Sequence, residues 1–119
     1  MNDPFAERVA AVRARFAAKL DARIAVIESS ITSQSGRAAG PDILVQAHRN
    51  AHDLCGVGPT LGYVGTAKVA RSIEQVLLAA VKAERMLNDD EVTFVRDRVV
   101  LLKSTAAAEM NSAGQEMAS

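Results

Sequence analysis

Apolar residues recur every three or four positions through most of the chain, which is the spacing of one face of an α-helix. The first stripe consists of Phe5, Val9, Val12, Phe16, Leu20, Ile24, Ile27 and Ile31. Asn2 or Asp3 can cap this segment, and Pro4 suits the first helical position. We therefore predict one long helix from Pro4 to about Ser30 or Thr32.

The segment 33–40 (SQSGRAAG) is small and polar and predicts a loop. Pro41 then begins a second predicted helix, with Asp42 in its first turn, where the helix dipole favours an acidic side chain. This helix should end near Gly58, because a residue that precedes a proline is disfavoured in the α conformation. Residues 59–62 are expected to form the turn that follows.

The periodicity continues through the rest of the chain and predicts a third helix from about Tyr63 to about Met86. Its apolar side carries Val69, Ile73, Val76, Leu77 and Ala80. Asn88 and Glu91 can form a capping box at the start of a fourth helix. The stripe of that helix is Val92, Val95, Val99, Leu102 and Ala106. Its end is expected to fray from about Ser112.

Four helices with short connections predict a single all-α domain over residues 1–119, an antiparallel four-helix bundle with up-down-up-down topology. The alternative is a pair of helical hairpins that needs a partner to close its core. The number of apolar positions favours the complete bundle, since 49% of the residues are hydrophobic.

The charge balance, the hydropathy and the cysteine content limit which partners and which cell compartment the protein can have. Fourteen basic and fourteen acidic residues balance, whereas a general nucleic-acid binder usually has a basic excess. No apolar run approaches the length of a transmembrane helix, and the N-terminus lacks the apolar segment of a signal peptide. A single cysteine cannot form an internal disulfide, which favours a reducing compartment. We expect a cytoplasmic protein that binds neither nucleic acid nor membrane.

The residues that could carry a reaction lie between Ala47 and Gly62. This stretch contains both histidines, the only cysteine and three of the seven glycines. An apolar stripe on this predicted helix consists of Leu44, Ala47, Ala51 and Leu54. His48 and His52 are four residues apart and share a face that is rotated away from this stripe. His52 should therefore be at least half exposed. Gly56, one turn later, leaves space above the imidazole for another backbone to approach.

This stretch resembles the phosphoacceptor helix of histidine-containing phosphotransfer (HPt) domains. Their usual pattern is A-H-x-L-K-G, then a small residue two positions on, then a hydrophobe and glycine. The residues at those offsets are Ala51, His52, Leu54, Gly56, Gly58, Leu61 and Gly62. The chain departs from the family at Cys55, where lysine is usual. The resemblance covers nearly all 119 residues through the helical layout, and it implies a four-helix bundle that carries a solvent-exposed histidine.

The resemblance also implies roles for individual residues. His52 would be the phosphoacceptor, and Glu74, which lies 22 residues later where the family often has Glu or Gln, would orient its imidazole. In an antiparallel pairing Arg71 would lie beside Cys55, so Arg71 is our candidate for the missing cation. The face that docks partners is predicted to comprise His48, Arg49, Cys55, Gly56, Gly58 and Lys68, with an apolar rim of Val57, Leu61 and Tyr63.

Members of this family are phosphocarriers, and the resemblance implies the same here. The phosphoryl group would come from the receiver domain of a hybrid histidine kinase and pass to the receiver domain of a response regulator. An enzyme that uses ATP is disfavoured, because the chain has no Gly-rich nucleotide loop and is too short to add an ATP-binding domain. No cofactor is expected on this chain, and the receiver would supply the magnesium ion and the aspartate.

Three other interpretations fit parts of the pattern. His48, His52 and Cys55 lie at i, i+4 and i+7 and are zinc-ligand types, but a structural zinc site takes four ligands and no other Cys or His exists. Cys55 and His52 can also form a nucleophile and base pair, although no oxyanion hole is evident. The third is a helical module that binds proteins without phosphotransfer, which the absent lysine keeps open.

Overall fold

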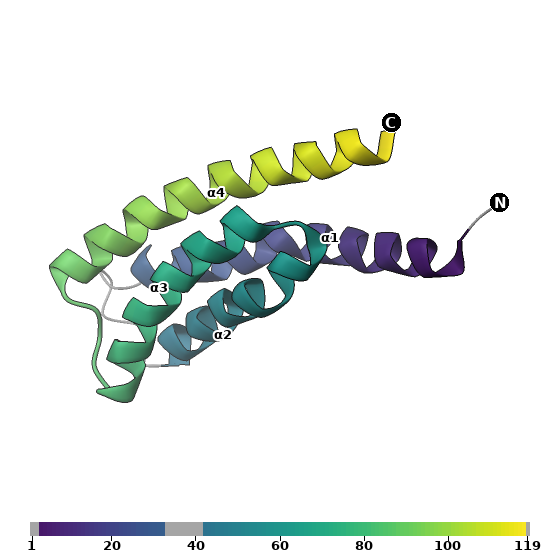
Figure 1. Ribbon diagram of the computed structural model, residues 1–119. Coiled ribbons are helices and arrows are strands. Elements are labelled where there is room, and N and C mark those ends of the chain that lie inside the picture. Colours follow the sequence, from purple (N-terminus) through teal and green to yellow (C-terminus); the bar gives the residue numbers. More distant parts are fainter. Residues whose placement is uncertain (1–2, 33–41, 119) are drawn as a thin grey trace.

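The chain is all-helical over the described residues, which in this computed structural model are 3–32 and 42–118, with side chains described as far as residue 112 (Figure 1). Its elements are α1 (Pro4–Thr32), α2 (Asp42–Val57), the short 3-10 helix η2 (Gly58–Leu61), α3 (Val64–Lys82) and α4 (Asp89–Ala118). The long first helix and the four-helix count are as predicted. The predicted loop 33–40, the predicted helix start at Pro41 and the possible cap Asn2 lie outside the described residues.

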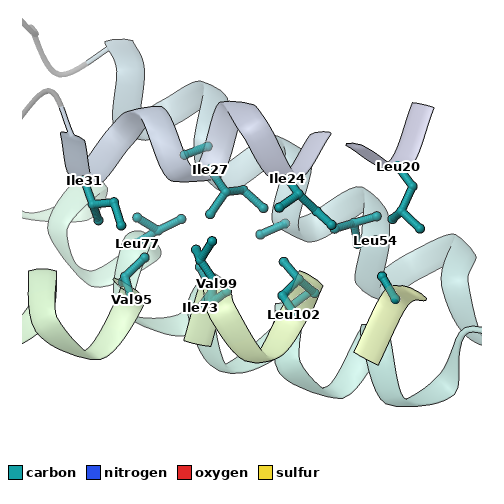
Figure 2. Close-up of a cluster of buried hydrophobic side chains, with 14 of the residues drawn as sticks. Leu20, Ile24, Ile27, Ile31, Leu54, Ile73, Leu77, Val95, Val99 and Leu102 are labelled. Atoms are coloured by element: carbon teal, nitrogen blue, oxygen red, sulfur yellow. The ribbon is translucent and has the colours of Figure 1, made fainter. Parts of the chain in front are cut away.

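The four α-helices enclose one core, in which α2 packs against α1 and α3, and α4 packs against the same two helices. Figure 2 shows apolar side chains from all four meeting between them. The labelled residues are Leu20, Ile24, Ile27, Ile31, Leu54, Ile73, Leu77, Val95, Val99 and Leu102, all buried. Truncating one such leucine or isoleucine to alanine typically costs about 2–5 kcal/mol. The core of the protein is therefore formed by the buried members of the predicted stripes.

The beginning of α1 lies outside this core. Its stripe is predicted from Phe5, but Phe5 is 71% exposed and Val12 is 39% exposed, and burial begins at Phe16. The helix is 29 residues long, against 16 for α2, and its first turns extend past the pair formed by α2 and α3 (Figure 1). The apolar spacing predicts the helix correctly there but not its burial.

The predicted caps of α1 and α4 are both present in the structure. The Phe5 amide donates to the Asp3 carboxylate (3.0 Å) at the start of α1. At the start of α4 the Glu91 amide donates to Asn88 Oδ1 (2.8 Å), and the Asn88 amide donates to Glu91 Oε1 (3.0 Å), which is the predicted capping box.

The predicted end of the third helix is wrong: α3 stops at Lys82 rather than near Met86. Glu84 takes a left-handed conformation with φ of 53°, and the Arg85 amide donates to the Ala80 carbonyl (3.1 Å). This is a common way to end a helix, and here a glutamate occupies a position that usually carries glycine. The turn lets Leu87 enter the core. Helix α4, by contrast, continues to Ala118, beyond the fraying predicted from Ser112.

Helix α4 also caps the start of α3. The Glu109 carboxylate accepts hydrogen bonds from the Gly65 amide (2.9 Å), the Thr66 amide (2.6 Å) and the Thr66 hydroxyl (2.6 Å). These amides are among the four that the first turn of any helix leaves without an intrahelical partner. The carboxylate of Glu109 therefore holds the N-terminus of α3 in place, directly after η2.

Among the helices in the described ranges, none combines the length and the apolar character needed to cross a membrane.

Candidate functional site

His52 lies on the outer side of α2, next to α3. The helix buries Leu44, Ala47, Ala51 and Leu54. His52 follows a buried alanine and is rotated away from that stripe, so its side chain is 67% exposed. The predicted exposure of this histidine is confirmed.

The imidazole of His52 is held by the carboxylate of Glu74 on α3. The distance between His52 Nδ1 and Glu74 Oε1 is 2.7 Å, and the Glu74 side chain is only 17% exposed. An ionised carboxylate can only accept, so Nδ1 carries the proton and Nε2 keeps its lone pair. Within the described part of the chain, Nε2 has no recorded hydrogen-bond partner and faces outward with the exposed ring.

The environment of Glu74 favours the ionised form. Its burial acts to raise the pKa of the carboxyl, but hydrogen bonds from His52 and Cys55 and the charge of the two imidazoles outweigh burial, so the pKa of Glu74 is lowered. At neutral pH the carboxylate is therefore charged and able to accept from Nδ1.

His48, one turn earlier on α2, contacts the same carboxylate oxygen. Its Nε2 lies 3.5 Å from Glu74 Oε1, and its side chain is 21% exposed. The rings of His48 and His52 are nearly parallel, with centroids 6.1 Å apart. The sequence predicts that the two histidines share a face, and they do. The contact between His48 and Glu74 was not predicted, because it depends on how α3 packs against α2.

Cys55, which lies one turn after Ala51 on α2, is neutral. Its thiol lies 3.6 Å from the carbonyl of Ala67 and also interacts with Glu74. The pKa of the Cys55 thiol is raised to about 12, chiefly by burial and further by the hydrogen bond and the charge of Glu74, while the positive charge of Arg71 acts to lower it. Cys55 therefore supplies no charge here, and Arg71 lies close enough to act on it.

An open hollow of about 330 Å³ adjoins the imidazole between α2 and α3. It is lined by His52, Cys55, Gly56, Arg71, Glu74, Gln75 and Leu78. A methyl group built on Gly56 would meet no atom within 4 Å, so the glycine leaves the surface open without being needed for packing. The structure thus brings together five of the residues that the sequence singled out.

The other two glycines of the motif have structural roles. Gly58 is buried, and a methyl group there would lie 3.1 Å from the Tyr63 carbonyl oxygen. That carbonyl accepts a hydrogen bond from the Ala67 amide, so it cannot move aside easily. Gly62 has φ of 92°, a left-handed conformation that glycine adopts without strain. Both glycines shape the turn between α2 and α3 rather than the open surface.

The remaining predicted docking residues divide into two groups. Arg49 and Lys68 are exposed, and neither lines the hollow. The predicted apolar rim is wrong for two of its three members: Leu61 and Tyr63 are buried, and only Val57, at 45%, is exposed. Tyr63 packs against Phe16 of α1, with ring centroids 4.9 Å apart.

A second hollow of about 340 Å³ lies on the opposite side of α2, toward α1. Its lining is Val12, Arg15, Phe16, Lys19, Arg23, Asp53, Val57 and Leu61. Arg23 donates to Asp53 across it (2.7 Å). The exposed ridge of α2 that carries His52 thus lies between two depressions, of which the second has a basic rim.

Among the described residues, no group of three or more His, Cys, Asp or Glu side chains is arranged to hold a metal ion. In comparisons of the whole chain with known proteins, no family model matches it, and no curated protein or solved structure is significantly similar to it.

Proposed function

We propose that this protein is a histidine phosphocarrier of the HPt type, an up-down-up-down antiparallel four-helix bundle that relays phosphoryl groups between receiver domains. The observation that carries the proposal is the exposed imidazole of His52, whose Nδ1 is hydrogen-bonded to the partly buried carboxylate of Glu74 while Nε2 on the exposed ring has no hydrogen-bond partner among the described residues. This is the arrangement that a nucleophilic imidazole needs.

The chemistry follows from the tautomer. The lone pair of His52 Nε2 attacks the phosphorus of an aspartyl phosphate, the N–P bond forms, and the bond from phosphorus to the aspartate oxygen breaks, with the electron pair leaving on the carboxylate. No proton has to depart, because Nδ1 keeps its hydrogen. The ring becomes positively charged, and the carboxylate of Glu74 at 2.7 Å stabilises that charge. Transfer to the next receiver is the reverse of this step.

The surface supports a protein partner rather than a small substrate. Gly56 leaves the approach to His52 open, and hollows flank the ridge on both sides. Arg71 lines the hollow beside His52 and would offset the charge of the phosphoryl group, which is close to two negative charges near neutral pH. The chain itself would need no cofactor, the receiver would bring magnesium, and the exchange would take place in the cytoplasm.

A neutral Cys55 at the lysine position favours one alternative, a module that binds receivers without accepting phosphate. Incubation with phosphorylated receiver domains separates the two functions. The proposal expects label on the wild-type protein with the acid lability of phosphohistidine, no label on His52→Gln, and label retained on His48→Gln. Binding of receivers without label would support the alternative, and label that survives in His52→Gln would exclude His52 as the acceptor.

A further inference from the structure

One carboxylate oxygen serves both histidines, and this arrangement gives His48 a function of its own. We propose that His48 is a positioning residue: it holds Glu74 in place for His52, and its protonation withdraws the charge of Glu74 from the phosphoacceptor. The inference rests on the proposed function for its consequence in phosphotransfer, but the coupling between the two histidines is a property of the free protein.

His48 and His52 both lie close to the same oxygen, Glu74 Oε1. This atom lies 2.7 Å from His52 Nδ1 and 3.5 Å from His48 Nε2. A carboxylate oxygen has two lone pairs, so it can accept from both rings. The shorter bond goes to the exposed imidazole, and the longer contact goes to an imidazole that is 21% exposed and is anchored by its place on α2.

His48 has little else to interact with. Its Nε2 is buried and makes no hydrogen bond within the usual distance to any described residue, so the contact with Glu74 is its one recorded polar interaction in that part of the chain. A buried nitrogen without a partner is unfavourable, which pulls Glu74 toward His48. The carboxylate oxygen is therefore hydrogen-bonded to His52 and also lies in contact with the ring nitrogen of His48.

Protonation of His48 would change how the negative charge of Glu74 is shared between the two histidines. A neutral His48 with its proton on Nε2 orients the carboxylate and leaves its negative charge to His52. A protonated His48 forms an ion pair with Glu74, so less negative charge remains to stabilise the positive ring that forms at His52. The other groups recorded around this carboxylate are the neutral thiol of Cys55 and, across the hollow, the guanidinium of Arg71. His48 and His52 therefore share one charged partner, and a change in one ring alters the electrostatics of the other through Glu74.

Substitutions of His48 separate the role of its hydrogen-bond donor from the role of its ring shape. His48→Gln keeps a side-chain donor, whereas His48→Phe keeps a flat ring and loses the donor. His48→Ala serves as a second donor-free variant if the larger ring of phenylalanine disturbs folding. Circular dichroism and thermal melting check the fold of each variant. The direct readout is long-range ¹H–¹⁵N correlation spectroscopy of the histidine side chain of His52 across pH, which distinguishes its two neutral tautomers and its protonated form.

In wild type and His48→Gln we expect the Nδ1–H tautomer of His52 to dominate at neutral pH. In the donor-free variants we expect a measurable population of the Nε2–H tautomer and a several-fold slower acceptance of phosphate from a receiver. The pH profile of acceptance should differ from that of wild type in all variants, because none of them retains the imidazole that contacts Glu74. Folded donor-free variants with the wild-type tautomer, rate and pH profile would overturn the inference.

The spectroscopic readout does not require phosphotransfer, so the two conclusions fail separately. A wild-type protein that takes no label but shows the tautomer shift in His48→Phe would exclude the proposed function and uphold the coupling. A protein that is labelled on His52, with a tautomer and rate indifferent to His48, would uphold the function and exclude His48 as a positioning residue.

Discussion

Replacing Glu74 by glutamine tests whether charge, and not only a hydrogen-bond acceptor, activates His52. The glutamine side chain has nearly the same shape, and its amide oxygen can still accept from Nδ1, so the tautomer is kept. What the variant lacks is the negative charge that stabilises the positive ring formed when Nε2 bonds to phosphorus. Glu74→Gln should therefore slow phosphoryl acceptance without unfolding the protein.

The expected size follows from the exposure of the pair. Opposite unit charges 4 Å apart interact by about 4 kcal/mol at the effective dielectric of a protein surface and by about 1 kcal/mol in water. Glu74 is 17% exposed but His52 is 67% exposed, so solvent screens the pair and the value lies near the lower end. About 1.4 kcal/mol corresponds to a factor of ten in rate, so we expect a slowing of about tenfold. Glu74→Ala removes the acceptor as well and should be slower still.

The assay is single-turnover transfer from one phosphorylated receiver, with the carrier in enough excess that docking does not limit the rate. Glu91→Gln is a matched control, because the Glu91 side chain is 19% exposed and belongs to the start of α4. Glutamine keeps an acceptor for the Asn88 amide but loses the ion pair with Arg85, so this variant should lower the free energy of unfolding slightly and leave the transfer rate unchanged. A wild-type rate in Glu74→Gln would refute the charge argument, and equal slowing in both variants would point to lost stability instead.

Three further predictions follow from the site and the fold. Gly56→Leu should block transfer sterically while melting temperature holds or rises, since nothing packs there, whereas Ala107→Leu on exposed α4 should transfer normally. Arg71→Ala should slow single-turnover transfer several-fold and Cys55→Lys should partly restore it; equal rates for wild type and Arg71→Ala would mean that the receiver supplies the charge. Glu109→Ala should cost about 1–3 kcal/mol in urea unfolding, because three donors at the start of α3 lose their acceptor.

The Glu109 prediction also has a pH dependence whose sign follows from its pKa. Burial acts to raise the pKa of Glu109, but hydrogen bonds from Thr66 and Gly65 outweigh it, so the pKa is lowered from its usual 4.5. A lowered pKa contributes stability that is present above the unfolded value and is lost as pH falls through the folded value. The difference in unfolding free energy between wild type and Glu109→Ala should therefore shrink on acidification below about pH 4.5. A difference that is constant with pH would show that the carboxylate charge is not what caps α3.

Local spacing predicted most of the helical architecture because the determinants are close in sequence. The stripe through Leu20, Ile24 and Ile27 and the capping box of Asn88 and Glu91 each depend on residues three or four apart. The exposure of His52 was predictable for the same reason, since it follows from the position of the buried stripe on the same helix.

Features that depend on contacts between distant residues were not predictable. Tyr63 was expected at a rim, but it packs on Phe16, 47 residues earlier, and no local pattern encodes that contact. The cap that Glu109 places on α3 spans more than 40 residues. The early end of α3 depends on Glu84 in a left-handed conformation, which is unusual for a residue other than glycine. In the first two cases the sequence predicts the element but not its neighbours, and in the third it predicts the helix but not its end.

The register of the site follows from the core beneath it. Each polar residue of the cluster comes directly after a buried one: the pairs are Ala47 and His48, Ala51 and His52, Ala70 and Arg71, and Ile73 and Glu74. One residue turns an α-helix by about 100°, so a side chain that follows a core position emerges at the edge of the buried face. Small buried alanines on α2 and α3 let the two helices approach closely. The two edges therefore face each other at hydrogen-bonding distance, and the core that stabilises the bundle also fixes the carboxylate against the imidazoles.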